Sequence, residues 1–213
     1  MNVLIRYFIL SIFFLPAVVS LGQIKDNIVW ASIKIDKKLS AKSSLYIAPI
    51  LRLNEDISSY QNTSIDFALK YKYSANWHIQ MLSRTWFIPD QAGRQFAWLD
   101  VGYKTPIGNL GLASHVRLHL ALDIHDRSDP DYLRWKSTIS FPNWGKAGFH
   151  LAIEPWFRLN DNMQLQRMRY EPGVNVQFRD DIDLNIVYRR EDTANLTPYK
   201  RFNMYVITLG FKI

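Results

Sequence analysis

The sequence predicts an all-β chain, an antiparallel up-and-down β-barrel built from long strands. The first observation is that apolar and polar residues alternate almost everywhere after residue 28, most clearly in residues 110–123. Side chains of a strand point alternately to two faces, whereas a helix would scatter both sets around its axis. The second observation is length, because many alternating stretches run to about 10–13 residues, against about 5–6 for strands of ordinary globular proteins.

Each alternating stretch is expected to form one strand. In chain order they are residues 28–37, 41–53, 62–73, 76–88, 94–104, 109–123, 131–142, 147–159, 163–178, 181–190 and 201–213. Residues 65–73 set Ile, Phe, Leu and Tyr against Asp, Ala and Lys. Residues 110–123 set leucines against His115, Arg117 and His119, and the last two stretches repeat this division. One face of each strand is therefore apolar and the other is polar or small.

The connections alternate in length. The short ones are YSAN at 73–76, TPIG at 105–108 and RDD at 179–181, and the longer polar ones are 54–63, 88–94, 124–131 and 191–200. Strands of about ten residues with dyad alternation, tight turns at one end and longer loops at the other are typical of a transmembrane β-barrel. Aromatic residues near strand ends fit interfacial girdles, and Phe211 near the end of the last strand resembles the assembly signal of outer-membrane barrels, which predicts the barrel assembly machinery as a partner.

The strand count predicts about 10–12 strands and leaves one conflict. Eleven stretches alternate, but single-chain bacterial barrels have an even number of strands. If the last strand ends on the short-turn side, the stretch 28–37 enters from the opposite side to the one an even barrel requires. We therefore expect ten strands, if this stretch is not a full barrel strand, or twelve, if the sequence contains one strand more than the alternation reveals.

The polar face is rich in arginine and carboxylates, and we expect it to line the barrel interior. The predicted lining residues are Arg52, Asp66, Arg84, Asp100, Arg117, Arg134, Glu154, Arg158, Arg167, Arg169, Glu171 and Arg189. These residues either pair to fill a narrow lumen or form an anion-preferring pore. A filled interior is favoured, because Trp86, Trp98 and Trp156 also point inward by strand parity.

The first residues predict export. Arg6 precedes an almost unbroken apolar core at 7–15, and small residues follow at 20–22, which is the pattern of a cleaved signal peptide spanning 1–22. Residues 23–213 then form a single outer-membrane β-barrel domain. The chain has no cysteine and a net charge of +7. Because an exported chain rarely meets nucleic acid, the expected partners are outer-membrane lipid and lipopolysaccharide rather than nucleic acid.

No group of residues predicts catalysis, a cofactor or a metal. His115 and His119 lie about 13 Å apart along one strand face, too far to bind the same zinc ion. Ser114 points to the opposite face from His115 and cannot be its nucleophile. A four-residue turn at 105–108 would place Trp98 opposite His115, which indicates packing. Residues 123–131 hold four aspartates and a histidine, without a calcium-ligand spacing that we recognise.

Three functional classes follow. The preferred one is a non-enzymatic outer-membrane barrel with a structural, narrow-pore or surface-interaction role. The second is an outer-membrane lipid-modifying hydrolase, which requires a Ser–His pair facing lipid. The third is a soluble periplasmic barrel that binds an apolar ligand, which requires the leucine face to point inward.

Most of the mature chain also resembles a known family, through short motifs. Trp30, the segments KKLSAKSSLYI, LRLNEDIS and FALKYKYSANWHI, and GYK at 102–104 resemble a family of small outer-membrane β-barrels that is common in the Bacteroidetes group and has no assigned function. The resemblance implies an outer-membrane location and carries no catalytic residues. Pro49 and Pro155 depart from the pattern, since a proline in mid-strand removes a backbone donor and predicts a bulge or an imperfect edge.

Overall fold

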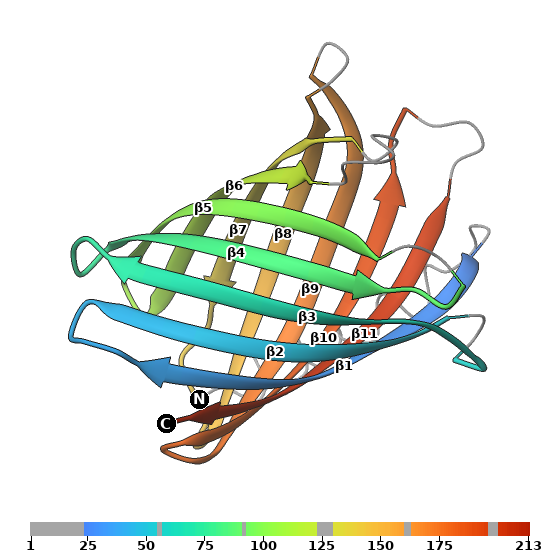
Figure 1. Ribbon diagram of the computed structural model, residues 1–213. Helices are drawn as coiled ribbons and strands as arrows, with labels where there is room; N and C mark the ends of the chain where they lie inside the picture. The colour runs from blue at the N-terminus through green and yellow to red at the C-terminus, as the bar shows by residue number, and fades with distance from the viewer. Residues whose placement is uncertain (1–23, 55–56, 91–92, 123–129, 160–162, 196–199) are drawn as a thin grey trace, which may run out of the picture.

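The computed structural model describes residues 24–54, 57–90, 93–122, 130–159, 163–195 and 200–213. Within these ranges the chain is all-β (Figure 1). The predicted signal peptide and most of the aspartate-rich loop lie outside the described residues. No helix among the described residues is long and apolar enough to cross a membrane.

Each stretch with alternating apolar and polar residues forms a strand. The strands are β1 (Ile24–Lys38), β2 (Ser43–Asn54), β3 (Ser59–Lys72), β4 (Trp77–Phe87), β5 (Arg94–Ile107), β6 (Leu110–Ala121), β7 (Tyr132–Ser140), β8 (Ala147–Arg158), β9 (Gln164–Arg179), β10 (Ile182–Thr193) and β11 (Arg201–Lys212). All eleven predicted stretches are therefore confirmed as strands, and their ends shift by a few residues.

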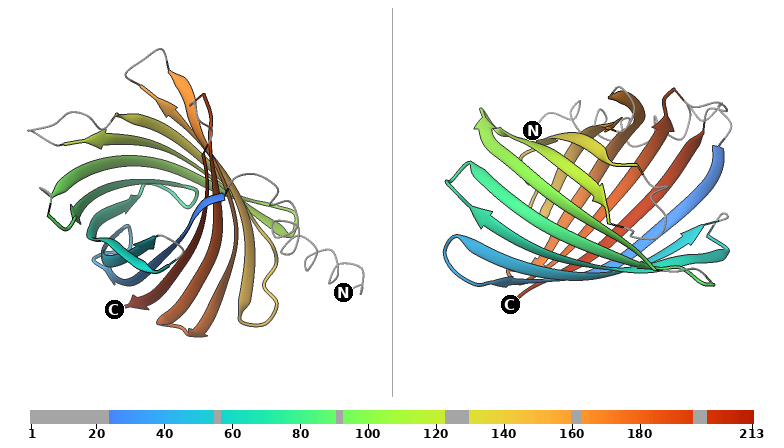
Figure 2. Two further views of the ribbon diagram at one scale, coloured as in Figure 1. Left: turned by 90° about the vertical axis from the view of Figure 1, so that its right-hand side faces the viewer. Right: turned by 45° about the horizontal axis from the view of Figure 1, so that its top comes forward.

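The sheet closes into a barrel because β1 pairs with β2 on one side and with β11 on the other (Figure 2). Strands that follow one another run antiparallel, so in an odd-numbered barrel the first and last run the same way. The pairing of β1 with β11 is accordingly parallel, from Asn27 opposite Asn203 to Asp36 opposite Lys212. The described strands number eleven, inside the expected range. The expected even number and fully antiparallel closure are corrected, because the stretch that the even-number rule would discard is a full strand.

Short turns gather at the barrel end that also holds the chain terminus Ile213, whose backbone pairs with that of Asp36. The β5–β6 turn consists of only Gly108 and Asn109, and Gly108 has a φ of 58°. Positive φ at the first turn residue is the type II′ hairpin geometry, which suits the twist of the two strands. The expected four-residue turn is therefore wrong.

The tighter turn changes the β5–β6 register. Asp100 lies opposite Arg117, Trp98 opposite His119, and Gly102 opposite His115. The predicted pairing of Trp98 with His115 is thus corrected by four positions. The register matters for the interior, because it places a carboxylate directly opposite an arginine.

Pro49 and Pro155, the two prolines expected to disturb the sheet, interrupt pairing on one side only. β1 and β2 pair at Ser32–Ile50 and again at Ile35–Ile47, with Pro49 in the gap. β7 and β8 pair at Arg134–Trp156 and again at Ser137–Ile153, around Pro155. A proline has no N–H to donate, so one ladder loses a bond while the other continues. Neither proline marks an open edge, since the barrel is closed.

The two faces of the sheet differ in polarity. Large apolar side chains are exposed on the outside of every strand, as at Ile33, Phe67, Leu99 and Ile207. The inward positions hold the buried residues, which include small apolar clusters and a larger set of polar and charged groups. The polarity is inverted relative to a soluble barrel, and the charged interior becomes the candidate site.

Candidate functional site: an arginine-lined barrel interior

The sequence-predicted lining residues all lie at inward positions and are buried or half-buried. Buried are Asp66, Asp100, Arg134, Glu154, Arg169 and Glu171, and half-buried are Arg52, Arg84, Arg117, Arg158, Arg167 and Arg189. They project from nine consecutive strands, β2 to β10, into one interior. The structure joins most of them into one network of ion pairs.

Two of the ion pairs follow directly from strand register. Asp66 of β3 lies opposite Arg84 of β4, and both carboxylate oxygens accept from Nε and Nη2 at 2.5 and 2.7 Å. Asp100 and Arg117 repeat this arrangement with both distances at 2.5 Å. Such bidentate pairs, with two parallel N–H···O bonds, are among the strongest charge-assisted hydrogen bonds in proteins. Each pair links two neighbouring strands across the inner face of the barrel.

The other carboxylates each bridge two cations. Glu154 accepts from Arg134 at 2.8 Å and from Arg169 at 3.4 Å. Arg169 also donates to Glu191 at 2.5 Å, which links β8, β9 and β10. Isolated carboxylates would be costly to bury, and the paired cations offset that cost.

Glu171 forms the second bridge, between Arg189 and Lys136. Sequence reasoning missed Glu191 and Lys136 as members of the network. Lys136 shares the parity of Arg134 on the same predicted strand, and Glu191 shares the parity of Arg189 just beyond the predicted strand end. Extending the inward parity through the full strands would have found both residues.

Tryptophan faces hold the guanidinium groups. Arg134 and Arg169 lie 3.7 and 4.0 Å from the ring centre of Trp156, and Arg84 and Arg117 lie 4.6 and 4.8 Å from that of Trp98. Cation–π contacts of desolvated arginines contribute about 2 kcal/mol or more. The rings therefore offset part of the repulsion between neighbouring guanidinium groups.

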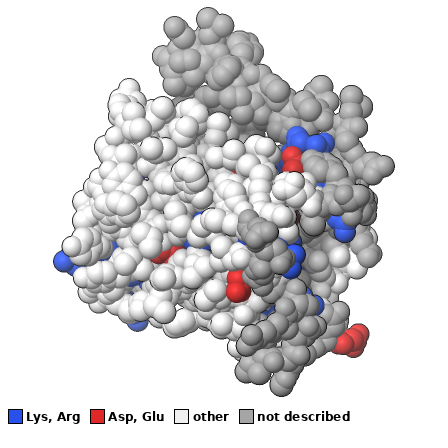
Figure 3. Space-filling model, turned by 90° about the horizontal axis from the view of Figure 1, so that it is seen from above, with Lys and Arg blue, Asp and Glu red and all other residues white. Residues whose placement is uncertain are grey.

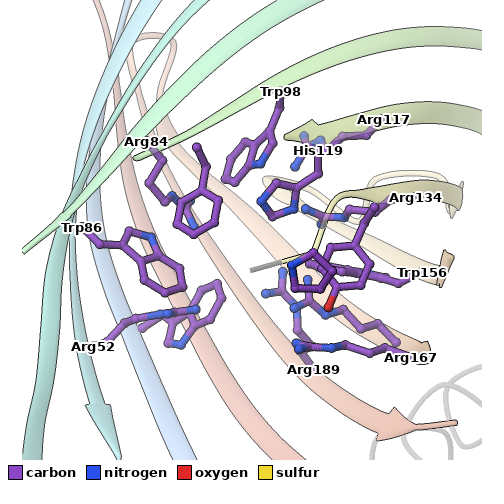
Figure 4. Close-up of a pocket in the computed structure, with 15 residues that line it drawn as sticks. Arg52, Arg84, Trp86, Trp98, Arg117, His119, Arg134, Trp156, Arg167 and Arg189 are labelled. Atoms are coloured by element: carbon purple, nitrogen blue, oxygen red, sulfur yellow. The ribbon is translucent and has the colours of Figure 1, made fainter. Parts of the chain in front are cut away.

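The interior contains separate cavities. One of about 260 Å³ lies near the ends of the strands that the longer loops connect, and its lining includes Trp30, Arg52, Trp98 and Trp156 (Figure 4). A second, of about 290 Å³, lies beyond it and is lined by lysine, histidine and carboxylate side chains as well as arginine. Both touch Arg117, which stands between them with other arginine–carboxylate pairs. We call the first cavity the arginine chamber.

No family model, curated protein or solved structure matches this chain.

The histidines of the described strands all point inward. His78 and His115 cover Gly102, where a Cβ would lie 2.2 and 2.7 Å from their ring atoms, and His150 covers Gly173 in the same way. His119 packs against the rings of Trp98 and Trp156 at 5.1 and 5.9 Å. No group of three or more metal-ligating side chains occurs among the described residues. The imidazole rings fit here because glycine has no side chain at Gly102 and Gly173.

Proposed function

We propose that the chain is an integral outer-membrane β-barrel with a non-enzymatic role, whose interior is crossed by its own ion pairs and aromatic rings, which leave separate cavities. The observation that carries this proposal is the inverted polarity of the closed barrel. Exposed apolar residues occur on the outside of every described strand, while arginines and carboxylates occupy the inside. Soluble monomers rarely expose a contiguous apolar patch above a few hundred Å².

The outer surface has the character of a lipid-facing band. In Figure 3 uncharged residues cover most of the visible face, and charged atoms of the described residues are sparse there. Tyr71, Trp77, Trp135 and Tyr205 are exposed on this outer side. Aromatic residues of this kind favour the membrane–water interface. An aqueous environment would leave this band in contact with water, whereas a bilayer covers it.

Strand length supports the same conclusion. The strands contain 9 to 16 residues, and about 9–11 tilted residues suffice to cross a bilayer. An odd strand number is unusual for bacterial barrels but occurs in a mitochondrial membrane barrel. Closure through a parallel pair satisfies the backbone groups of both terminal strands, as a hydrocarbon environment requires.

The alternatives lack a geometric basis in the described residues. A soluble barrel for an apolar ligand needs its apolar face inside, and that face lies outside. A lipid-modifying hydrolase needs a Ser–His pair toward lipid. The outward Ser114 accepts a hydrogen bond from Trp135 at 2.7 Å, and the described histidines lie on the inner face. The non-enzymatic proposal rests on this placement.

Fractionation of a Gram-negative host that expresses the full chain tests the location. We expect the protein in the outer-membrane fraction, with a band that migrates faster on gels before boiling than after. Release in the soluble periplasmic fraction would overturn the proposal.

A pair of variants makes the test specific to lipid contact. Phe67→Arg places a charge on the outer face at mid-strand, where the side chain is 52% exposed. We expect folded barrel stability to fall by about 2–4 kcal/mol, the cost near a bilayer midplane. Tyr73→Arg, at the adjoining turn and 72% exposed, is the control and should have little effect. Equal tolerance of both variants would indicate a water-exposed surface.

A further inference from the structure

The arginine chamber differs from the rest of the interior in its lining. Seven arginines and four tryptophans surround it, together with Phe96, His119, Pro130 and Tyr132 (Figure 4). No aspartate or glutamate is among these lining residues, whereas Asp100 and Glu154 line the second cavity. The carboxylates that pair with the chamber's arginines therefore lie behind the guanidinium groups, away from the space that the groups enclose.

The network around the chamber carries excess positive charge. Among the described residues, five carboxylates face the seven chamber arginines and Lys136, which leaves an excess of three positive charges; the carboxylates are Asp66, Asp100, Glu154, Glu171 and Glu191. Buried charges are costly unless they are compensated. An anion in the chamber would supply the missing compensation.

Arg52 is the clearest case of a missing partner. Its guanidinium lies between two indole rings, 3.7 Å from the centre of Trp30 and 4.7 Å from that of Trp86. It forms no salt bridge with any carboxylate of the described residues. The two rings hold the cation in a fixed plane, with its N–H edge unpaired. A side chain that only filled the lumen would not need a charge at this position.

Other polar groups at the chamber also lack hydrogen-bond partners. The indole N–H groups of Trp30, Trp86 and Trp98 and both ring nitrogens of His119 are buried and make no hydrogen bond within the described chain. Trp30, Trp98 and His119 are themselves at least nine-tenths buried. Native proteins leave few buried polar groups unsatisfied, so a cluster around one cavity points to a bound ligand or ordered water.

Three arginines add further free donors. Arg84, Arg117 and Arg134 use Nε and Nη2 for their carboxylates, and the Nη1 groups have no acceptor among the described residues. They come from β4, β6 and β7 and meet around Trp98. A planar carboxylate can accept from two directions in its plane, whereas a tetrahedral phosphate offers oxygens to donors on several sides.

We propose that the arginine chamber is a binding site for a small phosphate-bearing anion with two or more negative charges. Its volume of about 260 Å³ lies near the lower limit of small-ligand sites, about 300–1,000 Å³. The phosphate belongs to a soluble molecule, because the closed barrel wall separates the chamber from surrounding lipid. This inference does not require a membrane location, and its test in detergent can fail while the location proposal stands.

The test is titration calorimetry of the purified full-length mature barrel in an uncharged detergent, with inorganic pyrophosphate as the probe. We expect saturable binding of one pyrophosphate per barrel that weakens with added salt, and no binding of choline. Short-chain phosphatidate forms a second arm. If it competes with pyrophosphate, a lipid headgroup is the source of the phosphate, which would overturn the assignment to a soluble molecule.

Variants separate a built site from general charge attraction. Arg52→Gln should weaken pyrophosphate binding at least tenfold, and Trp86→Phe, which keeps the ring face but removes the N–H, should weaken it less. Arg179→Gln is the control, because the Arg179 side chain is 71% exposed and lies outside the chamber. The heat-modifiable gel shift shows that each variant is folded. Absence of saturable binding, or equal weakening by Arg52→Gln and Arg179→Gln, would overturn the proposal.

Discussion

Arginine in this interior has two distinct environments. Arg84 and Arg117 are held by carboxylates on their own neighbouring strands, whereas Arg52 is held only by aromatic rings. A charge of the first kind contributes to the folded structure. A charge of the second kind is left with capacity to bind an anion.

Glu171 shows how far the fold depends on individual carboxylates. Its side chain is 1% exposed and accepts from both Arg189 and Lys136. In Glu171→Gln these two half-buried cations lose their shared, buried anion, and breaking a buried pair typically costs about 3–5 kcal/mol. We expect a loss of this size in the free energy of unfolding, measured by urea titration of the folded band in detergent.

The control for this measurement is an exposed pair. Asp181 pairs with Arg179 at 3.2 Å, but their side chains are 49% and 71% exposed. Surface pairs of this kind contribute little, since water screens them. Asp181→Asn should leave unfolding almost unchanged, and a Glu171→Gln barrel as stable as this control would contradict the structural role of Glu171.

At the level of the strand, the sequence predicted which residues form strands better than it predicted how neighbouring strands pair. Alternation is a local property, so all eleven strands were recognisable before any pairing was known. The pairing of Asp100 with Arg117 depends on whether the turn has two or four residues, and the φ of Gly108 decides that. Inward parity placed the arginines, but it could not show that Arg52 would meet rings instead of a carboxylate, because those contacts come from three different strands.

The parallel closure of β1 on β11 is open to a direct test. Ser32 and Thr208 are paired residues whose hydroxyl oxygens lie 2.8 Å apart, and the chain has no cysteine of its own. In a Ser32→Cys, Thr208→Cys variant we expect an intramolecular disulfide after mild oxidation, because paired strand positions bring two Cβ atoms within bonding reach. The measurement is gel mobility of the unfolded protein with and without reductant.

A neighbouring pair supplies the control for closure. Asn185 lies opposite Thr208 on the far side of β11, one strand farther from Ser32. Ser32→Cys combined with Asn185→Cys should not form a disulfide in the folded barrel. Equal cross-linking in both variants, or none in either, would argue against the eleven-strand closure.

On the scale of the whole molecule, the contents of the lumen determine whether the barrel conducts. Between the arginine chamber and the second cavity stand Arg117 and Arg134, each paired with a carboxylate on a neighbouring strand, and the ring of Trp156 packs against Arg134. We expect a paired barrier of this kind to interrupt the water path through the lumen. We expect the native barrel to be silent in planar lipid bilayers.

Removing one pair from the barrier should open the lumen to anions. Arg134→Ser with Glu154→Ser deletes a buried ion pair that touches the second cavity, without changing net charge. The remaining arginines still outnumber the carboxylates around the chamber, so the electrostatic barrier favours anions. Small current steps with a reversal potential that indicates anion selectivity are expected for this variant.

The matched exposed pair, Arg179→Ser with Asp181→Ser, should stay silent, because it lies at the turn end and borders neither cavity. Steady conductance of the native barrel would show that the lumen is open, and cation-selective steps in the variant would contradict the excess positive charge of the chamber.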